Sequence, residues 1–348
     1  KYLVQRGEQV IIYGSTKSRV QTYATLLCSV LPDIDLSLEH DFISHINGMF
    51  KGRGSSWCVS KSIKKGVGIH HGLVPKFIQN EIIRLFNEGL IKVLVCTTTI
   101  TEGINTTSKN MIAMSGSKST KKLKSFDAKN IEGRSGRFLK HYQGRLFIFD
   151  KDFTKALESK DVGIKHKNYD LTAIKTEVDI QNTDSRYLSK NDNEKKKTIS
   201  LLAKLMNIPK EVIDTYKTIP ISSKLSVYDR ISRYTPSQHE IILRLKKNLN
   251  ARGTVTYDGV QLILDTVVGI IPEKTDLRGK IVTRTGAKNY SLFTYILPNV
   301  LKSGFEGSVN YYISTKSKSV DDAVKEAARF SFTTLRYEAV KYFGLFNR

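Results

Sequence analysis

The first part of the chain alternates short apolar runs with longer stretches of helical periodicity. The apolar runs are typical of buried strands and lie at 10–13 (VIIY), 91–96 (IKVLVC), 110–115 (NMIAMS) and 145–150 (RLFIFD). Strands that alternate with helices of about ten or more residues indicate βαβ units and a mostly parallel sheet. We therefore predict an α/β domain over residues 1–155.

The helices between these strands carry their own start and stop signals. Ser15 or Thr16 can cap the helix that follows the first strand. Pro75 opens a second helix whose apolar residues recur at spacings of three and four, and Gly89 ends it. Both stretches therefore predict amphipathic helices.

The remainder of the chain has a different pattern and is predicted to be mainly helical. Residues 156–225 are expected to form a linker and a helical segment, with the polar stretch 189–197 as a linker or exposed turn. Residues 226–348 are expected to form a mainly helical accessory domain. Within that domain, residues 289–305 predict a helix with a break at Pro298.

The balance of charge favours a polyanionic partner. The sequence has 56 Lys and Arg against 33 Asp and Glu, a formal net charge of +23. This excess favours nucleic acid, and the alternative is that the lysines are only solvated. No stretch approaches the ~18 uninterrupted apolar residues of a membrane span, and no signal peptide opens the chain. The three cysteines have neither disulfide-framework nor zinc spacing, so we expect a cytoplasmic protein.

A pair of arginines on a glycine-containing turn is the first candidate site. The stretch NIEGRSGR (130–137) places Arg134 and Arg137 three residues apart. A guanidinium is always charged and binds phosphate oxygens in a bidentate manner, and glycine lets the backbone turn tightly beside a ligand. The turn is therefore expected to bind a group with several negative oxygens.

Two further loops are expected to lie close to that turn. The hydroxyls of Thr97 and Thr98 directly follow a buried strand, and further along Gly103 permits close approach and Asn105 can bond a sugar hydroxyl. The segment GIHHG (68–72) leads into the second helix. Ligands of an open parallel sheet bind outside the carboxyl ends of its strands. We therefore expect all three loops to meet at that edge.

Taken in order, these motifs make residues 1–150 similar to the second RecA-like domain of superfamily-two helicases. QVIIYGSTKSRVQTYA resembles motif four, and GVGIHHGLVP resembles the segment that follows it. TTTITEGINTTSKN resembles motif five, and NIEGRSGR resembles motif six. The resemblance is to the superkiller-like branch. It implies a RecA-like fold and the C-terminal half of an ATP-dependent DNA or RNA helicase.

One position departs from the pattern of that branch. Motif six usually opens with glutamine, and this sequence has Asn130, which keeps the amide but shortens its reach. We interpret the change as a subfamily difference. The form N-x-E-G-R-x-G-R resembles helicases of bacterial antiphage systems such as Hachiman, which implies a role in antiviral defence.

The resemblance implies a role for each motif residue. Arg137 would be the arginine finger that reaches the γ-phosphate of ATP, with Arg134 beside it. The ATP-binding residues would be Gly103, Asn105, Asn130 and Gly133, and the nucleic-acid-binding residues would be Ser15, Thr16, His70, His71, Thr97 and Thr98. The alternative for Ser15 or Thr16 is a helix cap alone, and for either histidine a bond to backbone groups alone. No residue is assigned as a metal ligand.

Part of the expected nucleotide site is not in this sequence. It contains no G-x-x-x-x-G-K-[ST] phosphate loop and no D-E-x-H or D-E-A-D acid pair. ATP and Mg²⁺ are therefore expected to bind mainly to a missing N-terminal RecA-like domain, and this chain alone is expected to be inactive. The expected partners are that domain, single-stranded or forked nucleic acid and an effector such as a nuclease, with no membrane. The alternative is a catalytically idle nucleic-acid-binding scaffold for such a nuclease.

The resemblance also implies the nature of the accessory region. Residues 226–348 would form a winged-helix or ratchet-like domain that completes a channel for single-stranded nucleic acid. Aromatic side chains there could stack on bases, and the alternative is that they belong to the core. The candidates are Tyr234, Tyr290, Phe293 and Tyr295.

Overall fold

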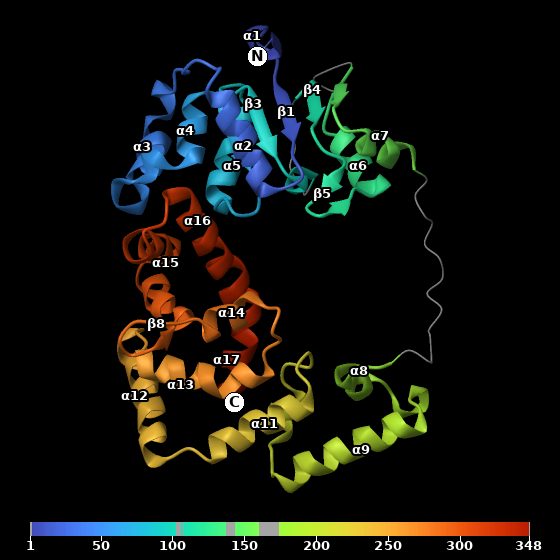
Figure 1. Ribbon diagram of the computed structural model, residues 1–348, viewed down its shortest axis with the longest axis vertical. Helices are drawn as coiled ribbons and strands as arrows, with labels where there is room; N and C mark the ends of the chain where they lie inside the picture. Colours follow the sequence, from blue (N-terminus) through green and yellow to red (C-terminus); the bar gives the residue numbers. More distant parts are fainter. Residues whose placement is uncertain (1, 102–105, 107, 137–142, 160–173, 348) are drawn as a thin grey trace. The chain divides into compact units, whose positions relative to one another are not determined.

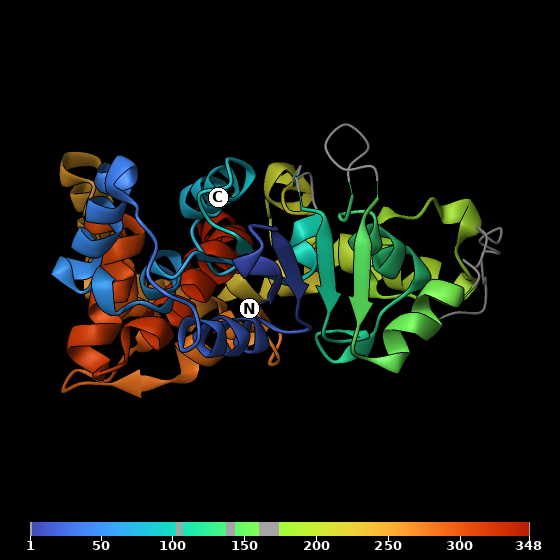
Figure 2. The ribbon, with the colours of Figure 1, turned by 90° about the horizontal axis from the view of Figure 1, so that it is seen from above.

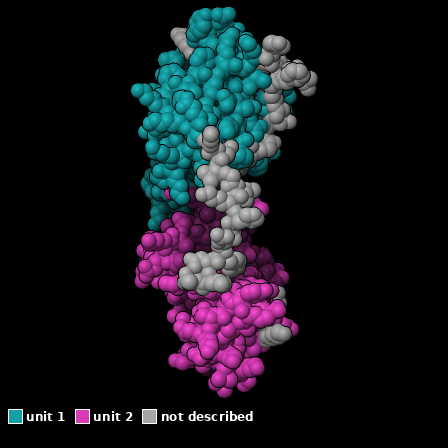
Figure 3. Space-filling view, turned by 90° about the vertical axis from the view of Figure 1, so that its right-hand side faces the viewer, with its two compact units in different colours: residues 1–165, 312–328 teal, residues 166–311, 329–348 magenta. Residues whose placement is uncertain are grey.

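The chain folds into two compact units. The computed structural model describes residues 2–101, 106, 108–136, 143–159 and 174–347 (Figure 1). Unit 1 comprises residues 1–165 and 312–328, and unit 2 comprises residues 166–311 and 329–348 (Figure 3). Each unit has its own buried apolar side chains.

A five-stranded parallel sheet forms the centre of unit 1. Its strands are β1 (Val10–Tyr13), β2 (Val67–His70), β3 (Val93–Cys96), β4 (Asn110–Ala113) and β7 (Arg145–Ile148), in the order β2-β3-β1-β4-β7. All four pairings are parallel, so the prediction of a parallel sheet is confirmed. The four predicted apolar runs are strands of this sheet, and the GIHHG segment contributes the end of β2.

Helices cover both faces of this sheet. They include α2 (Lys17–Cys28), α3 (His40–Gly52), α4 (Cys58–Lys64), α5 (Lys76–Asn87), α6 (Ser125–Glu132) and α7 (Lys151–Glu158). Figure 2 shows α2 and α5 on opposite sides of the strands. All residues of β1, β2 and β3 are buried, as expected for parallel strands that are covered on both faces. The predicted RecA-like arrangement is therefore present in unit 1.

A helix from the C-terminal part of the chain also belongs to unit 1. Most of α16 (Val320–Arg329) lies in this unit and buries Ala323, Val324, Ala327 and Ala328. In its first turn, Asp321 Oδ1 accepts a hydrogen bond of 2.9 Å from the backbone amide of Cys58. A backbone amide at the start of an α-helix has no acceptor within the helix. Asp321 supplies that acceptor and so caps α4, although it lies far from α4 in the sequence. Shorter elements of unit 1 are α1 (Tyr2–Gln5) and the antiparallel hairpin of β5 (Ser117–Lys118) and β6 (Lys121–Lys122).

Unit 2 is mainly helical, as predicted. Its elements include α8 (Glu177–Asn182), α9 (Lys190–Leu205), α10 (Lys210–Asp214), α11 (Ile221–Ser232), α12 (Pro236–Arg252), α13 (Tyr257–Val267), α14 (Asp276–Val282), most of α15 (Leu292–Lys316), a π-helical stretch (Phe330–Ala339) and α17 (Val340–Phe346). A two-stranded hairpin of β8 (Arg284–Thr285) and β9 (Tyr290–Ser291) precedes α15. Within the described residues, no helix combines the length and apolar character needed to cross a membrane.

Two details of the predicted accessory region are wrong. Residues 190–197, expected as a linker or exposed turn, form the first half of α9. Ser189 caps this helix by accepting a hydrogen bond of 3.1 Å from the amide of Asp192. The prediction is wrong because a charged run that follows a capping residue is as compatible with an exposed helix as with a loop. The second detail is the predicted break at Pro298. α15 continues through Pro298, and its non-helical residues are Ser303 and Gly304, where glycine adopts φ 57°.

Candidate functional site

The carboxyl ends of three neighbouring strands bring several candidate residues together. Tyr13, His70 and Cys96 lie in register at the ends of β1, β2 and β3. The amide of Gly14 donates to the Cys96 oxygen at 2.9 Å, and the amide of Thr97 donates to the His70 oxygen at 3.2 Å. The loops that follow these strands therefore meet at one edge of the sheet, as expected from the sequence.

The threonine run after β3 is held by a histidine of the neighbouring strand. Residues Thr98–Thr101 form a 3₁₀ turn. The Thr99 hydroxyl lies 3.1 Å from Nδ1 of His70 and 3.2 Å from the Thr97 hydroxyl. Thr97 is buried, whereas Thr98 and Thr99 are half-buried. Thr99, which the sequence does not distinguish from its neighbours, thus connects the GIHHG segment to motif five.

Both histidines of the GIHHG segment are neutral at physiological pH. His70 and His71 are 1% and 2% exposed. Burial lowers the pKa of His70 to about 4, with a further contribution from Lys76. Burial, followed by Lys17, lowers the pKa of His71 to about 3. Neither ring can therefore attract a phosphate as a cation, and their chemistry here is that of neutral hydrogen-bonding groups.

Sequence reasoning missed a buried glutamine that holds the loop after β2. Gln79 on α5 is 6% exposed, and its Nε2 donates to the backbone oxygens of His71 at 3.1 Å and Val74 at 2.7 Å. The His71 Nδ1 accepts a weaker bond of 3.3 Å from the amide of Leu73. The sequence contains one signal for this role, because Gln79 is a polar residue next to the apolar face of the predicted helix. Gln79 fixes the backbone of this loop at the sheet edge.

The two candidates after β1 differ in their surroundings. Thr16 is the N-cap of α2, and its hydroxyl accepts a bond of 3.2 Å from the amide of Arg19. The cap expected as an alternative is thus present at Thr16. Ser15 is half-buried, and its backbone oxygen accepts a bond of 2.9 Å from the amide of Ser119 beside the β5–β6 hairpin.

The arginine turn lies at the other end of the sheet. It follows α6, and the amide of Gly136 donates to the oxygen of Ser108 at 3.0 Å, two residues before the start of β4. Gly136 also packs directly on Gly144, just before β7. The expectation that all three loops share the carboxyl edge is therefore wrong for this turn. The physical reason is that a helix between two parallel strands runs back along the sheet, so the residues after it return to the amino ends.

The candidate residues consequently fall into two groups. The nucleic-acid group at the carboxyl edge contains Ser15, Thr16, His70, His71, Thr97 and Thr98, and the described members of the ATP group are Asn130, Gly133 and Arg134. The length of β4 alone separates the two ends by roughly 10 Å. The segment 97–108 joins them, because Thr97 is bonded to His70 and Ser108 to Gly136. Gly103, Asn105 and Arg137 lie outside the described residues.

The chemistry of the ATP group suits phosphate and not a metal ion. Asn130 and Arg134 are half-buried and Gly133 is exposed at the end of α6. An amide and a guanidinium are donors to phosphate oxygens, whereas Mg²⁺ requires oxygen ligands. Among the residues that the structure describes, no cluster of three His, Cys, Asp or Glu could hold a metal ion. Asn130 and Arg134 can therefore donate hydrogen bonds to phosphate oxygens.

Comparison with known proteins finds a helicase domain in the first part of the chain. Residues 1–139 match the family of the helicase conserved C-terminal domain. The chain is similar to Anti-bacteriophage protein B of Escherichia coli (strain K12), with 31% identity over 107 residues, which cover 31% of this chain and 15% of the relative. It is similar to the human exosome RNA helicase MTR4, with 35% identity over 79 residues, 22% of this chain and 8% of the relative. It is also similar to human activating signal cointegrator 1 complex subunit 3, with 28% identity over 146 residues, 38% of this chain and 6% of the relative.

The fold, the order of the motifs and the family match define unit 1 as a helicase C-terminal domain of RecA-like architecture. The chain is similar to superfamily-two helicases of the superkiller-like branch. It spans 15% or less of the length of each of these three relatives.

Proposed function

We propose that this chain is the C-terminal half of an ATP-dependent helicase or translocase that acts on single-stranded or forked nucleic acid. A RecA-like domain N-terminal to it would hold the phosphates of ATP and Mg²⁺. The observation that carries the proposal is the segment 97–108, which is bonded to the nucleic-acid group at His70 and to the arginine turn at Gly136. One backbone segment thus links the two activities that a translocase must couple.

The proposed mechanism assigns the arginine turn to the nucleotide. Arg137, with Arg134 beside it, neutralises charge on the γ-phosphate as it is transferred to water, and Asn130 and Gly133 contact the same nucleotide with Gly103 and Asn105. Mg²⁺, when bound, supplies charge neutralisation at the phosphate oxygens. An arginine finger accelerates related phosphoryl-transfer reactions by about 10³–10⁵. A displacement of the turn would pull on Ser108 and move the threonines at the other end of the segment.

The proposed mechanism assigns the carboxyl edge of the sheet to the nucleic-acid backbone. Hydroxyls of Thr97 and Thr98, with Ser15, bond phosphate oxygens, while His70 orders the threonines through Thr99. The net charge of +23 supports binding to a polyanion. Phosphate contacts carry little sequence information, so DNA and RNA are both candidate substrates.

We further propose that the protein serves antiviral defence in the cytoplasm, with a nuclease or another effector as a partner. The name of one relative, Anti-bacteriophage protein B, and the Hachiman-like form of motif six support this role. The proposed division of the chain is a motor domain over residues 1–155, a linker and helical segment over 156–225, and a winged-helix or ratchet-like domain over 226–348.

The test uses the full-length protein with its N-terminal RecA-like domain. ATP turnover is measured with and without single-stranded DNA, and separately RNA, for the wild type and for Arg137→Ala. We expect nucleic acid to stimulate turnover and the variant to lose about 10³-fold or more. The matched control is Arg145→Ala on β7, whose guanidinium pairs with Glu8 at 3.2 Å and should be nearly neutral for turnover. Nucleic-acid binding without turnover would contradict the motor and indicate a scaffold, and appreciable turnover by the 348-residue chain alone would contradict the division of the ATP site.

A further inference from the structure

The four aromatic candidates of the accessory region separate into two kinds. Phe293 is fully buried and packs against Phe330 and Phe343, so it belongs to the core. Tyr234 packs on Phe346, and its hydroxyl is bonded to the hydroxyl of Thr266. Tyr290 and Tyr295 lie instead in a cluster at the surface. Both rings are half-buried and lie next to an exposed third tyrosine, Tyr257.

Three tyrosines form this surface cluster, which we call the tyrosine platform. It consists of Tyr257 at the start of α13, Tyr290 on β9 and Tyr295 on α15. The ring of Tyr257 lies 5.9 Å from that of Tyr290, with an interplanar angle of 16°, and 5.7 Å from that of Tyr295. Tyr257 is 41% exposed. The platform therefore presents an aromatic face to solvent that is already stacked on its inner side.

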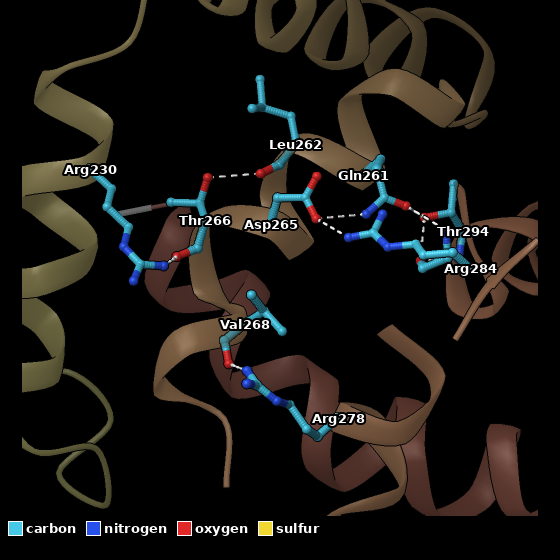
Figure 4. A network of polar contacts seen from close by, with 10 residues as sticks. Arg230, Gln261, Leu262, Asp265, Thr266, Val268, Arg278, Arg284 and Thr294 are labelled. Carbon is cyan, nitrogen blue, oxygen red and sulfur yellow. Dashed lines mark hydrogen bonds and ion pairs between the residues drawn. The ribbon is translucent and has the colours of Figure 1, made fainter. Parts of the chain in front are cut away.

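Buried polar contacts hold the platform in place. Gln261 is 7% exposed, and its Oε1 accepts bonds from the amide of Ser291 at 2.7 Å and from the hydroxyl of Thr294 at 2.9 Å. On the same helix, Asp265 pairs with Arg284 of β8 at 2.5 Å (Figure 4). These bonds tie the β8–β9 hairpin and the start of α15 to α13. A platform fixed in this way loses little conformational freedom when a ligand stacks on it.

A pocket with cationic side chains adjoins the platform. Its volume is about 480 Å³, and its lining includes Arg252, Thr254, Val255, Leu301 and Lys302. Thr254 and Val255 come just before Tyr257, and Lys302 lies seven residues after Tyr295, on the same side of α15. The rise of about 1.5 Å per residue places Lys302 roughly 10 Å along the helix from Tyr295. The platform and the pocket are thus two parts of one surface.

The charge of this surface is positive. Arg252 and Lys302 at the pocket and Lys288 in the β8–β9 turn are exposed. Two nearby carboxylates are engaged within the protein, because Asp258 accepts a bond from the Tyr290 hydroxyl and Asp265 pairs with Arg284. Aromatic faces next to cationic side chains are the combination that binds single-stranded nucleic acid without sequence preference.

We propose that the tyrosine platform and its pocket bind single-stranded nucleic acid, with one base stacked on Tyr257 and a neighbouring phosphate bound between Arg252 and Lys302. The class of ligand rests on the proposed function, whereas the position of the site comes from unit 2 itself. The site needs no sequence readout, since every base has an aromatic face and every nucleotide a phosphate. It would be a second binding site for the nucleic-acid strand, independent of the threonines of unit 1.

The test measures binding of labelled single-stranded oligonucleotides to the 348-residue chain by fluorescence anisotropy. Tyr257→Leu should weaken binding by about five-fold or more, the lower end for loss of one stacked base, and Tyr257→Phe should restore it. Lys302→Gln should reduce the slope of the logarithm of the binding constant against the logarithm of the salt concentration by about 1, the change expected for the loss of one phosphate contact. The matched control is Tyr187→Leu, because Tyr187 is 62% exposed in the same unit and lies outside the platform.

An oligonucleotide of abasic sugar-phosphate separates stacking from charge. The wild type and Tyr257→Leu should bind it equally, because it has no base to stack. Equal losses for Tyr257→Leu and Tyr187→Leu, or a loss that persists on the abasic strand, would overturn the proposal. ATP turnover of the full-length protein distinguishes the two proposals. If Arg137→Ala leaves turnover unchanged, the motor is contradicted and the binding result for the platform still stands. If Tyr257→Leu leaves oligonucleotide binding unchanged while stimulated turnover is normal, only the platform is contradicted.

Discussion

The arginine turn contains a glycine in a left-handed conformation, Gly136, and replacing it with alanine should disrupt the turn. Gly136 has φ 69°, a conformation that side chains rarely adopt. A Cβ at this position would lie 2.3 Å from the backbone nitrogen and 2.4 Å from the Cα of Gly144. Both distances are far below van der Waals contact, and the obstructing atoms are backbone. The turn must therefore move for alanine to fit.

The expected cost can be worked from these two effects. The left-handed conformation costs an L residue about 1–2 kcal/mol. Forcing a methyl group into a close-packed contact typically costs a further ~1–3 kcal/mol. We expect Gly136→Ala to lower the free energy of unfolding of unit 1 by about 2–5 kcal/mol. The displaced turn should also reduce nucleic-acid-stimulated ATP turnover of the full-length protein, because it carries Arg134 and leads to Arg137.

Gly133, in the same motif, provides the matched control. It has φ −63°, and the nearest atom to a Cβ there would be the Lys129 oxygen at 3.3 Å. Alanine fits that backbone, so Gly133→Ala should change the stability by about 1 kcal/mol or less. Trp57 is the only tryptophan of the sequence and is buried in unit 1, so its fluorescence during urea unfolding reports on that unit. Equal unfolding midpoints for the two variants would refute the reasoning.

Two further predictions use the same fluorescence assay. The folded-state pKa values of His70 and His71, about 4 and about 3, lie below the ordinary value of 6.5, so the unfolded chain binds more protons below pH 6.5. Stability should therefore be highest above pH 6.5 and fall as the pH decreases, by about 3 kcal/mol for His70 by pH 4; a flat profile between pH 6.5 and 5 would contradict this. Asp321→Ala should destabilise unit 1 by about 1 kcal/mol, because the Cys58 amide loses its acceptor, whereas Asp321→Asn should retain most of the stability. Equal losses in both Asp321 variants would show that the cap is not the cause.

Several parts of the fold could be predicted because they depend on local pattern. Apolar runs of four residues that repeat between amphipathic helices specify buried parallel strands, and β1, β3, β4 and β7 lie where the pattern places them. The start of α5 after Pro75 and its end before Gly89 follow from backbone chemistry that neighbouring residues determine. The predictions for Pro298 and for the run 189–197 are wrong because an interior proline weakens a helix without always ending it, and because a charged stretch is compatible with an exposed helix.

For the candidate site too, some features follow from the sequence and others only from the folded structure. The sequence by itself determined the identity and order of the motif residues, and thus the resemblance of residues 1–139 to the helicase C-terminal domain. Only the tertiary structure decided that the arginine turn returns to the amino ends of the strands, that burial keeps His70 and His71 neutral, and that Tyr257 joins two of the four aromatic candidates at the surface while Phe293 enters the core. The physical reason is range: strand and helix signals act over a few residues, whereas burial, charge state and the meeting of loops depend on segments that are far apart in the chain and adjacent only after it has folded.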